Sequence, residues 1–170
     1  MKSIFTLKGQ EILVDDEDFE RVSAYRWQVS VRGYVRRLSK NCGKRSAVAM
    51  HRFILGIPNG DPRIVDHANG IKTDNRRSNL RVCTKSQNGY NQGPQKTNTT
   101  GFKGFTRHKK TGSFIARIRA NGRSIHIGSF KTAESAHAAY CVKASELHGE
   151  FANFGVAARA AEIERKEQEK

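Results

Sequence analysis

The chain has 170 residues, and its 31 Lys and Arg against 16 Asp and Glu give it a formal net charge of +15. Only 36% of the residues are hydrophobic, and no run approaches the roughly 20 apolar residues that span a bilayer. These properties exclude a helical membrane protein and predict a soluble, intracellular protein with one ordinary domain or two small ones.

So basic a chain is most simply explained by a polyanionic partner. A protein that neutralises phosphates releases their condensed counterions, which favours binding to nucleic acid. A cationic surface that is merely solvated is the alternative.

The cysteines give no sign of a metal or disulfide framework. Cys42, Cys83 and Cys141 are far apart and show no C-x-x-C spacing. We therefore expect reduced, buried thiols and no structural zinc.

The first sixty residues alternate short strand-like and helical segments. Strand-like runs occur at residues 11–14, 27–31 and 34–38. Asp15 or Asp16 can cap a short helix that extends through Tyr25. A second helix is predicted over residues 48–55, and on it His51 is expected to pack or to contact phosphate rather than to catalyse.

The clearest boundary in the chain lies at residues 92–100, which contain no apolar residue and include a Gly-Pro pair. Residues 93–100 are therefore predicted to be a linker. It separates a domain of residues 1–92 from one of residues 101–155, and both carry an excess of basic residues. Residues 156–170 have a helix-forming composition but little to bury, which predicts a helical or frayed tail.

The second half predicts three antiparallel strands followed by one helix. Strand-like runs occur at residues 102–107, 113–119 and 124–128. Asn121-Gly122 between the last two is a strong signal for a type I′ hairpin. Thr132 can cap a helix over residues 133–147, which Gly149 would end. One face of this helix is expected to gather Ala133, Ala136, Ala139, Tyr140 and Leu147.

Alternation along the strands sorts the side chains of this sheet onto two faces. One face carries Phe114, Ala116, Ile118, Ile125 and Ile127. We expect this face to pack under the helix. The other face carries Ile115, Arg117, Arg119 and His126. A sheet of this width can enter the major groove, where Arg binds guanine O6 and N7.

A carboxylate and an imidazole stand next to each other at the end of an apolar strand. Asp66 and His67 directly follow Ile64-Val65. The chain can turn at residues 68–70 and return as a second strand over residues 79–83. A neutral imidazole is suited to removing a proton from water near pH 7, as phosphodiester hydrolysis requires.

A helix after this strand pair is expected to complete a metal site. Thr84 and Gln87 match a capping box, so a helix starts here. It places Asn88 and Asn91 on one face and can bring Asn88 close to Asp66. One carboxylate, one amide oxygen, waters and substrate phosphate are enough for Mg²⁺, which stabilises the leaving oxygen as a Lewis acid.

Several spaced elements resemble the HNH nucleases of phage and intron homing endonucleases, which are built on the ββα-metal motif. The matching segments are Val65-Asp66-His67, Asp74-Asn75, Ser78-Asn79-Leu80-Arg81 and Ser86-Gln87-Asn88. The resemblance implies His67 as general base and Asn79 as the catalytic-site residue that ties the two strands together. It implies Asp66 and Asn88 as ligands of one Mg²⁺ or Mn²⁺. As in the HNN subset, Asn88 and Asn91 stand where the family name suggests a histidine, and we favour Asn88.

Residues from about 100 to 155 resemble the plant ethylene-response-factor DNA-binding domain, the AP-two type. The matching segments are residues 101–107, 118–119, 127–130, 132–134, 138–140 and 148–154. By this resemblance, the candidates for contacts from the sheet to DNA are Lys103, Arg107, Arg117, Arg119 and His126. Phe114 and His126 stand where the plant proteins carry tryptophans, so the plant target sequence is not transferred.

Together these features predict an α+β protein with an N-terminal ββα-metal nuclease module and a C-terminal three-stranded antiparallel sheet packed on one helix. The predicted function is metal-dependent, site-selective cleavage of double-stranded DNA by a homing-type endonuclease. We expect a phage- or mobile-element-encoded protein that acts in the host cytoplasm. No membrane or obligatory protein partner is expected, and one active centre per chain is compatible with a monomer.

Two other functions remain open at this point. A non-catalytic DNA-binding regulator would bind DNA with or without Mg²⁺ and would never nick it. An RNA-binding protein is less favoured, because the second module lacks an exposed aromatic pair for stacking unpaired bases.

Overall fold

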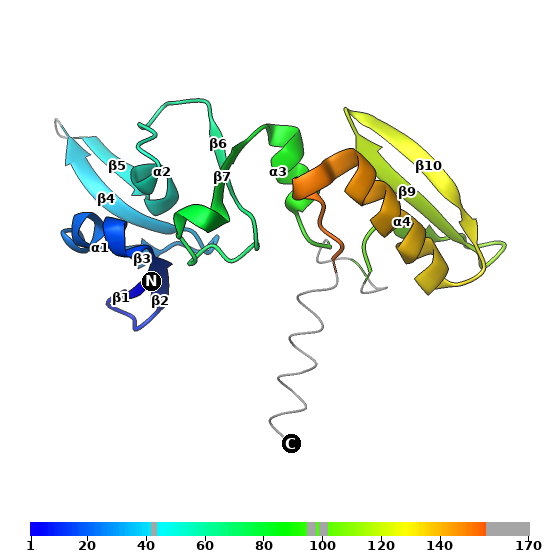
Figure 1. Ribbon diagram of the computed structural model, residues 1–170, viewed down its shortest axis with the longest axis horizontal. Helices are drawn as coiled ribbons and strands as arrows, with labels where there is room; N and C mark the ends of the chain where they lie inside the picture. The colour runs from blue at the N-terminus through cyan, green and yellow to red at the C-terminus, as the bar shows by residue number, and fades with distance from the viewer. Residues whose placement is uncertain (42–43, 95–97, 99–101, 156–170) are drawn as a thin grey trace, which may run out of the picture. The chain divides into compact units, whose positions relative to one another are not determined.

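The computed structural model describes residues 1–41, 44–94, 98 and 102–155. The chain divides into two compact units, Met1–Lys85 and Ser86–Lys170, which can be followed along the chain in Figure 1. This division falls earlier than the boundary after residue 92 that the sequence predicts. Most of the predicted linker and the whole predicted tail lie outside the described residues, so both stay predictions.

In its described residues, the first unit contains three small antiparallel sheets. β1 (Lys2–Phe5) pairs with β2 (Glu11–Val14), β3 (Gln28–Val29) and β5 (Lys44–Ala49) flank β4 (Val35–Asn41), and β6 (Ile64–His67) pairs with β7 (Leu80–Cys83). The segments between them include α1 (Asp16–Ser23), α2 (Met50–Ile54) and the short 3-10 helix η1 (Arg77–Asn79).

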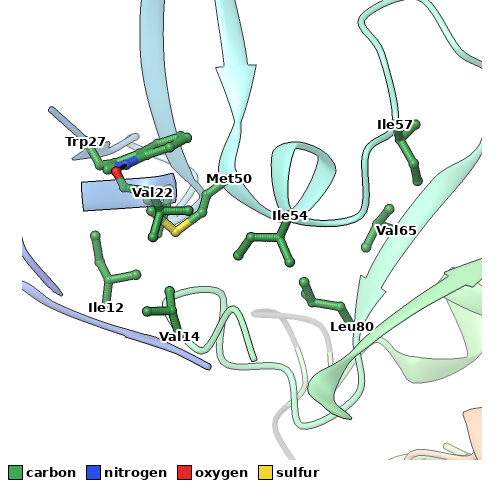
Figure 2. Packing of buried hydrophobic residues seen from close by; sticks show 10 residues of the cluster. Ile12, Val14, Val22, Trp27, Met50, Ile54, Ile57, Val65 and Leu80 are labelled. Carbon is green, nitrogen blue, oxygen red and sulfur yellow. Dashed lines mark hydrogen bonds between the residues drawn. The ribbon is translucent and has the colours of Figure 1, made fainter. Parts of the chain in front are cut away.

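One hydrophobic core joins the elements of this unit. Figure 2 shows its buried side chains: Ile12, Val14, Val22, Trp27, Met50, Ile54, Ile57, Val65 and Leu80. The polar end of the only tryptophan is satisfied inside this core, because Trp27 Nε1 donates to the carbonyl of Val22 at 2.8 Å. Because Val65 and Leu80 belong to this cluster, the β6–β7 hairpin is fixed to the core.

The second unit consists of a sheet, one long helix and a short helix at its start. In the described residues, β9 (Phe114–Ala120) lies between β8 (Phe105–Arg107) and β10 (Arg123–Phe130), and both pairings are antiparallel. α4 (Ala133–His148) follows, then the 3-10 helix η2 (Gly149–Phe151), while α3 (Lys85–Asn91) precedes the sheet. Ala116 and Ile118 pack against α4 through Ala136, Tyr140 and Ala144.

Local signals in the second unit are confirmed. Asn121 and Gly122 have φ angles of 49° and 77°, both positive, as a type I′ turn requires. Thr132 caps α4, since its hydroxyl accepts from the N–H of Ser135 at 3.2 Å. The predicted helix face needs one correction. At the C-terminal end of α4, Leu147 is 38% exposed, and the buried residue there is His148.

In the first unit, several predicted boundaries are corrected. The helix expected over residues 48–55 begins only at Met50, because Val48 and Ala49 pair with β4 as the end of β5. The strand expected over residues 27–31 shrinks to Gln28–Val29, and β1 was not predicted. Asp15 is the N-cap of α1, but its carboxylate accepts from the backbone N–H of Arg77.

None of the helices in the described part of the chain is long and apolar enough to cross a membrane.

Candidate active site

The strand β6 ends with Asp66 and His67, and its antiparallel partner is β7. The register places Asp66 opposite Arg81 and His67 opposite Leu80. Successive strand residues point to opposite faces, and the contacts of these two side chains differ accordingly. Asp66 pairs with Arg81, whereas the ring of His67 lies among other rings and an amide.

The His67 ring lies against Asn75, His51 and Tyr34. Its Nε2 lies 3.4 Å from Oδ1 of Asn75, and its centroid lies 5.3 Å from the His51 ring, edge to face. The ring of Tyr34 is 6.0 Å away. Only 4% of His67 is exposed, so solvent reaches a small part of the imidazole and its orientation is restricted.

Burial is the main influence on the ionisation of His67. It lowers the pKa of the imidazole below 6.5, and this effect is opposed in part by the Asn75 hydrogen bond and by the nearby carboxylates of Asp66 and Asp74. A lowered pKa means that the ring is neutral at neutral pH. A neutral imidazole is the form that accepts a proton, as a general base must.

Asn79 connects the start of β7 to the loop that follows His67. Its Oδ1 accepts from the N–H of Asn69 at 2.9 Å, and its Nδ2 donates to the carbonyl of Asp74 at 2.8 Å. The backbone carbonyl of Asn79 accepts from the N–H of Ala68 at 2.9 Å. These bonds tie the start of β7 to the loop between the two strands. The predicted role of Asn79 as a catalytic-site residue stays a prediction.

From the sequence, His51 was expected only to pack or to contact phosphate, but the structure places its ring against that of the predicted base, His67. His51 is 9% exposed, and its Nδ1 is buried without a hydrogen-bond partner. Burial lowers the pKa of His51 to about 4, helped by the charges of His67 and Arg52. His51 is therefore a second neutral imidazole beside His67.

Asp66 forms an ion pair across the hairpin that the sequence analysis did not identify. Arg81 donates to Oδ2 of Asp66 from Nε at 3.0 Å and from Nη2 at 2.8 Å. The two side chains are 16% and 8% exposed. The sequence could have revealed this ion pair, because a hairpin that pairs residues 64–67 with 80–83 places Arg81 opposite Asp66.

The two asparagines that are candidates for the helix ligand lie on α3, in the second unit. Within that unit the ring of Tyr90 stacks on His148 with centroids 3.8 Å apart, and Asn153 donates to the carbonyl of Asn91 at 2.8 Å. Asn88 is partly buried and Asn91 is 8% exposed. Asp66 lies in the first unit, so a metal site shared with Asn88 stays a prediction from the sequence.

The five residues of the second unit that are predicted to contact DNA divide into two groups. Arg107, Arg117, Arg119 and His126 are exposed, as predicted. Lys103 instead donates from Nζ to the carbonyls of Tyr90 and Gln92, at 2.7 and 2.6 Å. Burial lowers the pKa of Lys103 to about 8. This lysine caps the C-terminal end of α3, and a DNA contact by it stays a prediction.

Comparison with known proteins gives this geometry a family. Residues 48–90 match a family model described as HNH endonuclease, and this segment contains Asp66, His67, Asn79 and Asn88. The chain is also 34% identical over 149 residues to "Uncharacterized HNH endonuclease L560" of Acanthamoeba polyphaga mimivirus, which covers 85% of this chain and 74% of the viral protein. The chain belongs to the HNH endonuclease family.

A second relative of this HNH endonuclease is "Protein 3.8" of Escherichia phage T7. It is 31% identical over 98 residues, or 58% of this chain and 78% of the phage protein. No solved structure matches the chain. Family membership makes the protein a nuclease, an enzyme that hydrolyses DNA. The family match ends at residue 90 and gives no support to the AP-two-type resemblance.

HNH nucleases generally use a divalent metal ion. Carboxylate and amide oxygens, which this chain offers at Asp66 and Asn88, are the donors that a hard cation prefers. The described residues contain no group of three or more His, Cys, Asp and Glu side chains that could hold a metal. The predicted donors are instead the carboxylate of Asp66 and the amide oxygen of Asn88. Mg²⁺ keeps several waters and accepts phosphate oxygens, so two protein ligands can be enough for it.

Proposed function

We propose that this HNH endonuclease is a metal-dependent, site-selective enzyme of the homing type that cuts double-stranded DNA. His67 acts as the general base for the attacking water. The observation that carries this proposal is the buried, neutral imidazole of His67, held by Asn75 and His51 inside the segment that matches the family. A base whose orientation is restricted before substrate arrives loses little entropy in the reaction.

Asp66 and Asn88 are the proposed ligands of one Mg²⁺ or Mn²⁺. When bound, the cation would stabilise the negative charge that develops on the leaving 3′ oxygen. The protein's own part is to present one carboxylate at the end of β6, while Asn79 holds the loop beyond it.

The exposed face of the β8–β9–β10 sheet is the proposed DNA-docking surface, and we call it the sheet face. It carries Arg117, Arg119 and His126, none of which is buried. Arg107 is exposed as well, but it pairs with Phe114 and so lies on the face of the sheet that packs on α4. A DNA contact by Arg107 is therefore proposed from the resemblance and not from this face. This unit has three antiparallel strands and one long helix, the arrangement that the sequence predicts. Exposed arginines can bind phosphates for register and guanine edges for sequence.

A binding module on the same chain increases the local concentration of the nuclease at its site, so modest affinity can direct cutting. The relatives come from a giant virus and from a phage. We propose that this protein is likewise encoded by a virus or mobile element and acts in the host cell. One active centre per chain supports nicking of one strand by a monomer.

Metal dependence is tested with supercoiled plasmid, wild-type protein and Mg²⁺, with and without a chelator. We expect open-circle product with Mg²⁺ and none with the chelator, and Asp66→Ala should abolish cutting while DNA binding persists. Asp16→Ala is the matched control, because Asp16 is an exposed aspartate of the same unit, 63% exposed. Cutting that continues in chelator, or in Asp66→Ala at the wild-type rate, would refute the metal assignment.

A further inference from the structure

The carboxylate of Asp66, the proposed metal ligand, already forms an ion pair with the guanidinium of Arg81. Arg81 places two nitrogens on the same oxygen, Oδ2, and the pair is largely removed from solvent. The two residues are direct partners in the β6–β7 register, so the backbone holds them opposite each other. The hairpin therefore keeps Arg81 next to Asp66, while the guanidinium itself can move with its side chain.

This arrangement leaves little net negative charge for a divalent cation. No cluster of three acidic or other metal-binding side chains occurs in the described residues. The nearby carboxylate of Asp74 is committed to Arg76, at 2.6 Å, and to Asn69, at 2.8 Å. The charges of Asp66 and Arg81 cancel, so a cation that binds Asp66 meets a fixed positive charge beside it.

DNA changes this balance. A backbone phosphate supplies negative charge and is an acceptor that arginine binds in the same bidentate way as a carboxylate. An incoming phosphate can therefore attract the Arg81 guanidinium away from Asp66 and provide a further ligand for the cation. Metal and DNA would then strengthen each other's binding.

We propose that Arg81 couples loading of the catalytic cation to DNA: it occupies Asp66 in the free protein and transfers to a substrate phosphate in the complex. The proposal rests on the proposed function, in which Asp66 is a metal ligand. Two cations that share one carboxylate lie only about 4–6 Å apart. Even at the dielectric constant of water, the repulsion between charges of +2 and +1 there corresponds to about tenfold in affinity.

The test measures binding of Mn²⁺ to the full chain without DNA, by the electron paramagnetic resonance signal of free Mn²⁺. Arg81→Gln should bind Mn²⁺ about tenfold more tightly than wild type. Arg81→Thr is a second neutral replacement with high strand propensity, in case the first variant does not fold. Arg81→Lys keeps the charge and should bind Mn²⁺ about as wild type does.

The matched control is Arg63→Gln, which removes an arginine from Asp61, another aspartate of the same unit, and should leave Mn²⁺ affinity unchanged. Neutral variants at Arg81 that bind Mn²⁺ no more tightly than wild type would overturn the proposal. Asp66→Ala separates the two claims: if it binds Mn²⁺ as wild type does, the ligand assignment itself is wrong.

The second arm repeats the titration with duplex DNA in the His67→Ala background, which should cut at least about a hundredfold more slowly than wild type. DNA itself binds some Mn²⁺, and the Asp66→Ala,His67→Ala protein with the same duplex measures that baseline. Above this baseline, the duplex should tighten Mn²⁺ binding about tenfold more in the protein that keeps Arg81 than in the protein that also carries Arg81→Gln. Equal tightening in both proteins would show that DNA does not act through Arg81.

Discussion

The two units of this HNH endonuclease keep their charged and polar side chains in different places. The first unit buries Asp18, His51, Asp66, His67, Asp74, Asn75 and Asn79. The second unit displays most of its charges, and the arginines of the sheet face alternate with the buried Ala116 and Ile118. Catalysis needs groups whose orientation and pKa are fixed by burial, whereas binding a phosphate chain needs charges that a partner can reach.

The difference extends to how each unit is stabilised. Buried polar groups must be paired, and in the first unit Asp18 accepts from both Arg21 and Arg77. The second unit depends on the close approach of its helix to the sheet, with Gly104 directly against the Tyr140 ring. The first unit should therefore respond to charge changes, and the second to changes in side-chain volume.

The largest expected effect on stability is that of Gly104→Ala in the second unit. A Cβ on Gly104 would overlap the Tyr140 ring, and φ there is +97°. We expect a loss of about 3 kcal/mol or more. Gly122→Ala is the control, because its φ is +77° but its surroundings are open, and it should cost only about 1–2 kcal/mol.

Urea unfolding separates the two units in that experiment. The single Trp27 reports on the first unit by fluorescence, and far-ultraviolet circular dichroism follows α4. Gly104→Ala should move the dichroism transition and leave the Trp27 transition unchanged. A shift of both by the same amount would contradict the separation into two units.

In the first unit, the corresponding test is a change of charge, Asp18→Asn. Asp18 is 2% exposed, and its two oxygens accept from Arg21 and Arg77, so losing its charge should cost about 2 kcal/mol. Asp16→Asn, on the same helix but 63% exposed, should cost under about 1 kcal/mol. The Trp27 fluorescence transition in urea measures both, and equal losses would show that burial does not decide the effect.

The stability of the first unit should fall when the pH falls from about 6.5 to about 4. In this window the unfolded chain protonates His51 while the folded protein does not, because its folded pKa is about 4. The unfolded state thus binds more protons and is favoured as the pH falls, by at most about 3 kcal/mol. His51→Gln should flatten the pH dependence of the Trp27 transition, and an unchanged slope would contradict the buried, neutral His51.

The smallest expected effect concerns the sheet face and does not involve folding. Arg117→Ala or Arg119→Ala should each reduce by about one the slope of log affinity for DNA against log salt concentration. Lys143→Ala is the control, since Lys143 lies on α4 and pairs with Glu146 at 2.7 Å. Fluorescence anisotropy with labelled duplex measures the slopes. A control that weakens binding as much as the arginine variants would place the DNA elsewhere.

Features that depend on a few neighbouring residues could be predicted from the sequence. The Asn121-Gly122 turn and the Thr132 cap need only local chemistry, and both are present. The order of Asp66, His67 and Asn79 was enough to find the hairpin, because strand, turn and return strand are local too.

What could not be predicted depends on long-range contacts. β1 exists only because β2 pairs with it, and its own pattern is weak. Lys103 reads as a DNA-binding lysine in the sequence, but the end of α3 captures its ammonium. The sequence likewise cannot show that His51 packs against His67, since residues 55–63, which connect α2 to β6, follow no regular pattern.

The most direct test of the central claim is single-turnover DNA cleavage by His67→Ala with Mg²⁺ and enzyme in excess, beside the DNA affinity of the same protein. His67 is 4% exposed, so this experiment decides whether so buried an imidazole can remove a proton from the attacking water. We expect cleavage to slow by about 10²–10⁴-fold, with DNA affinity within about twofold of wild type. A variant that folds and cuts at the wild-type rate would show that His67 supports the hairpin and that another group is the base.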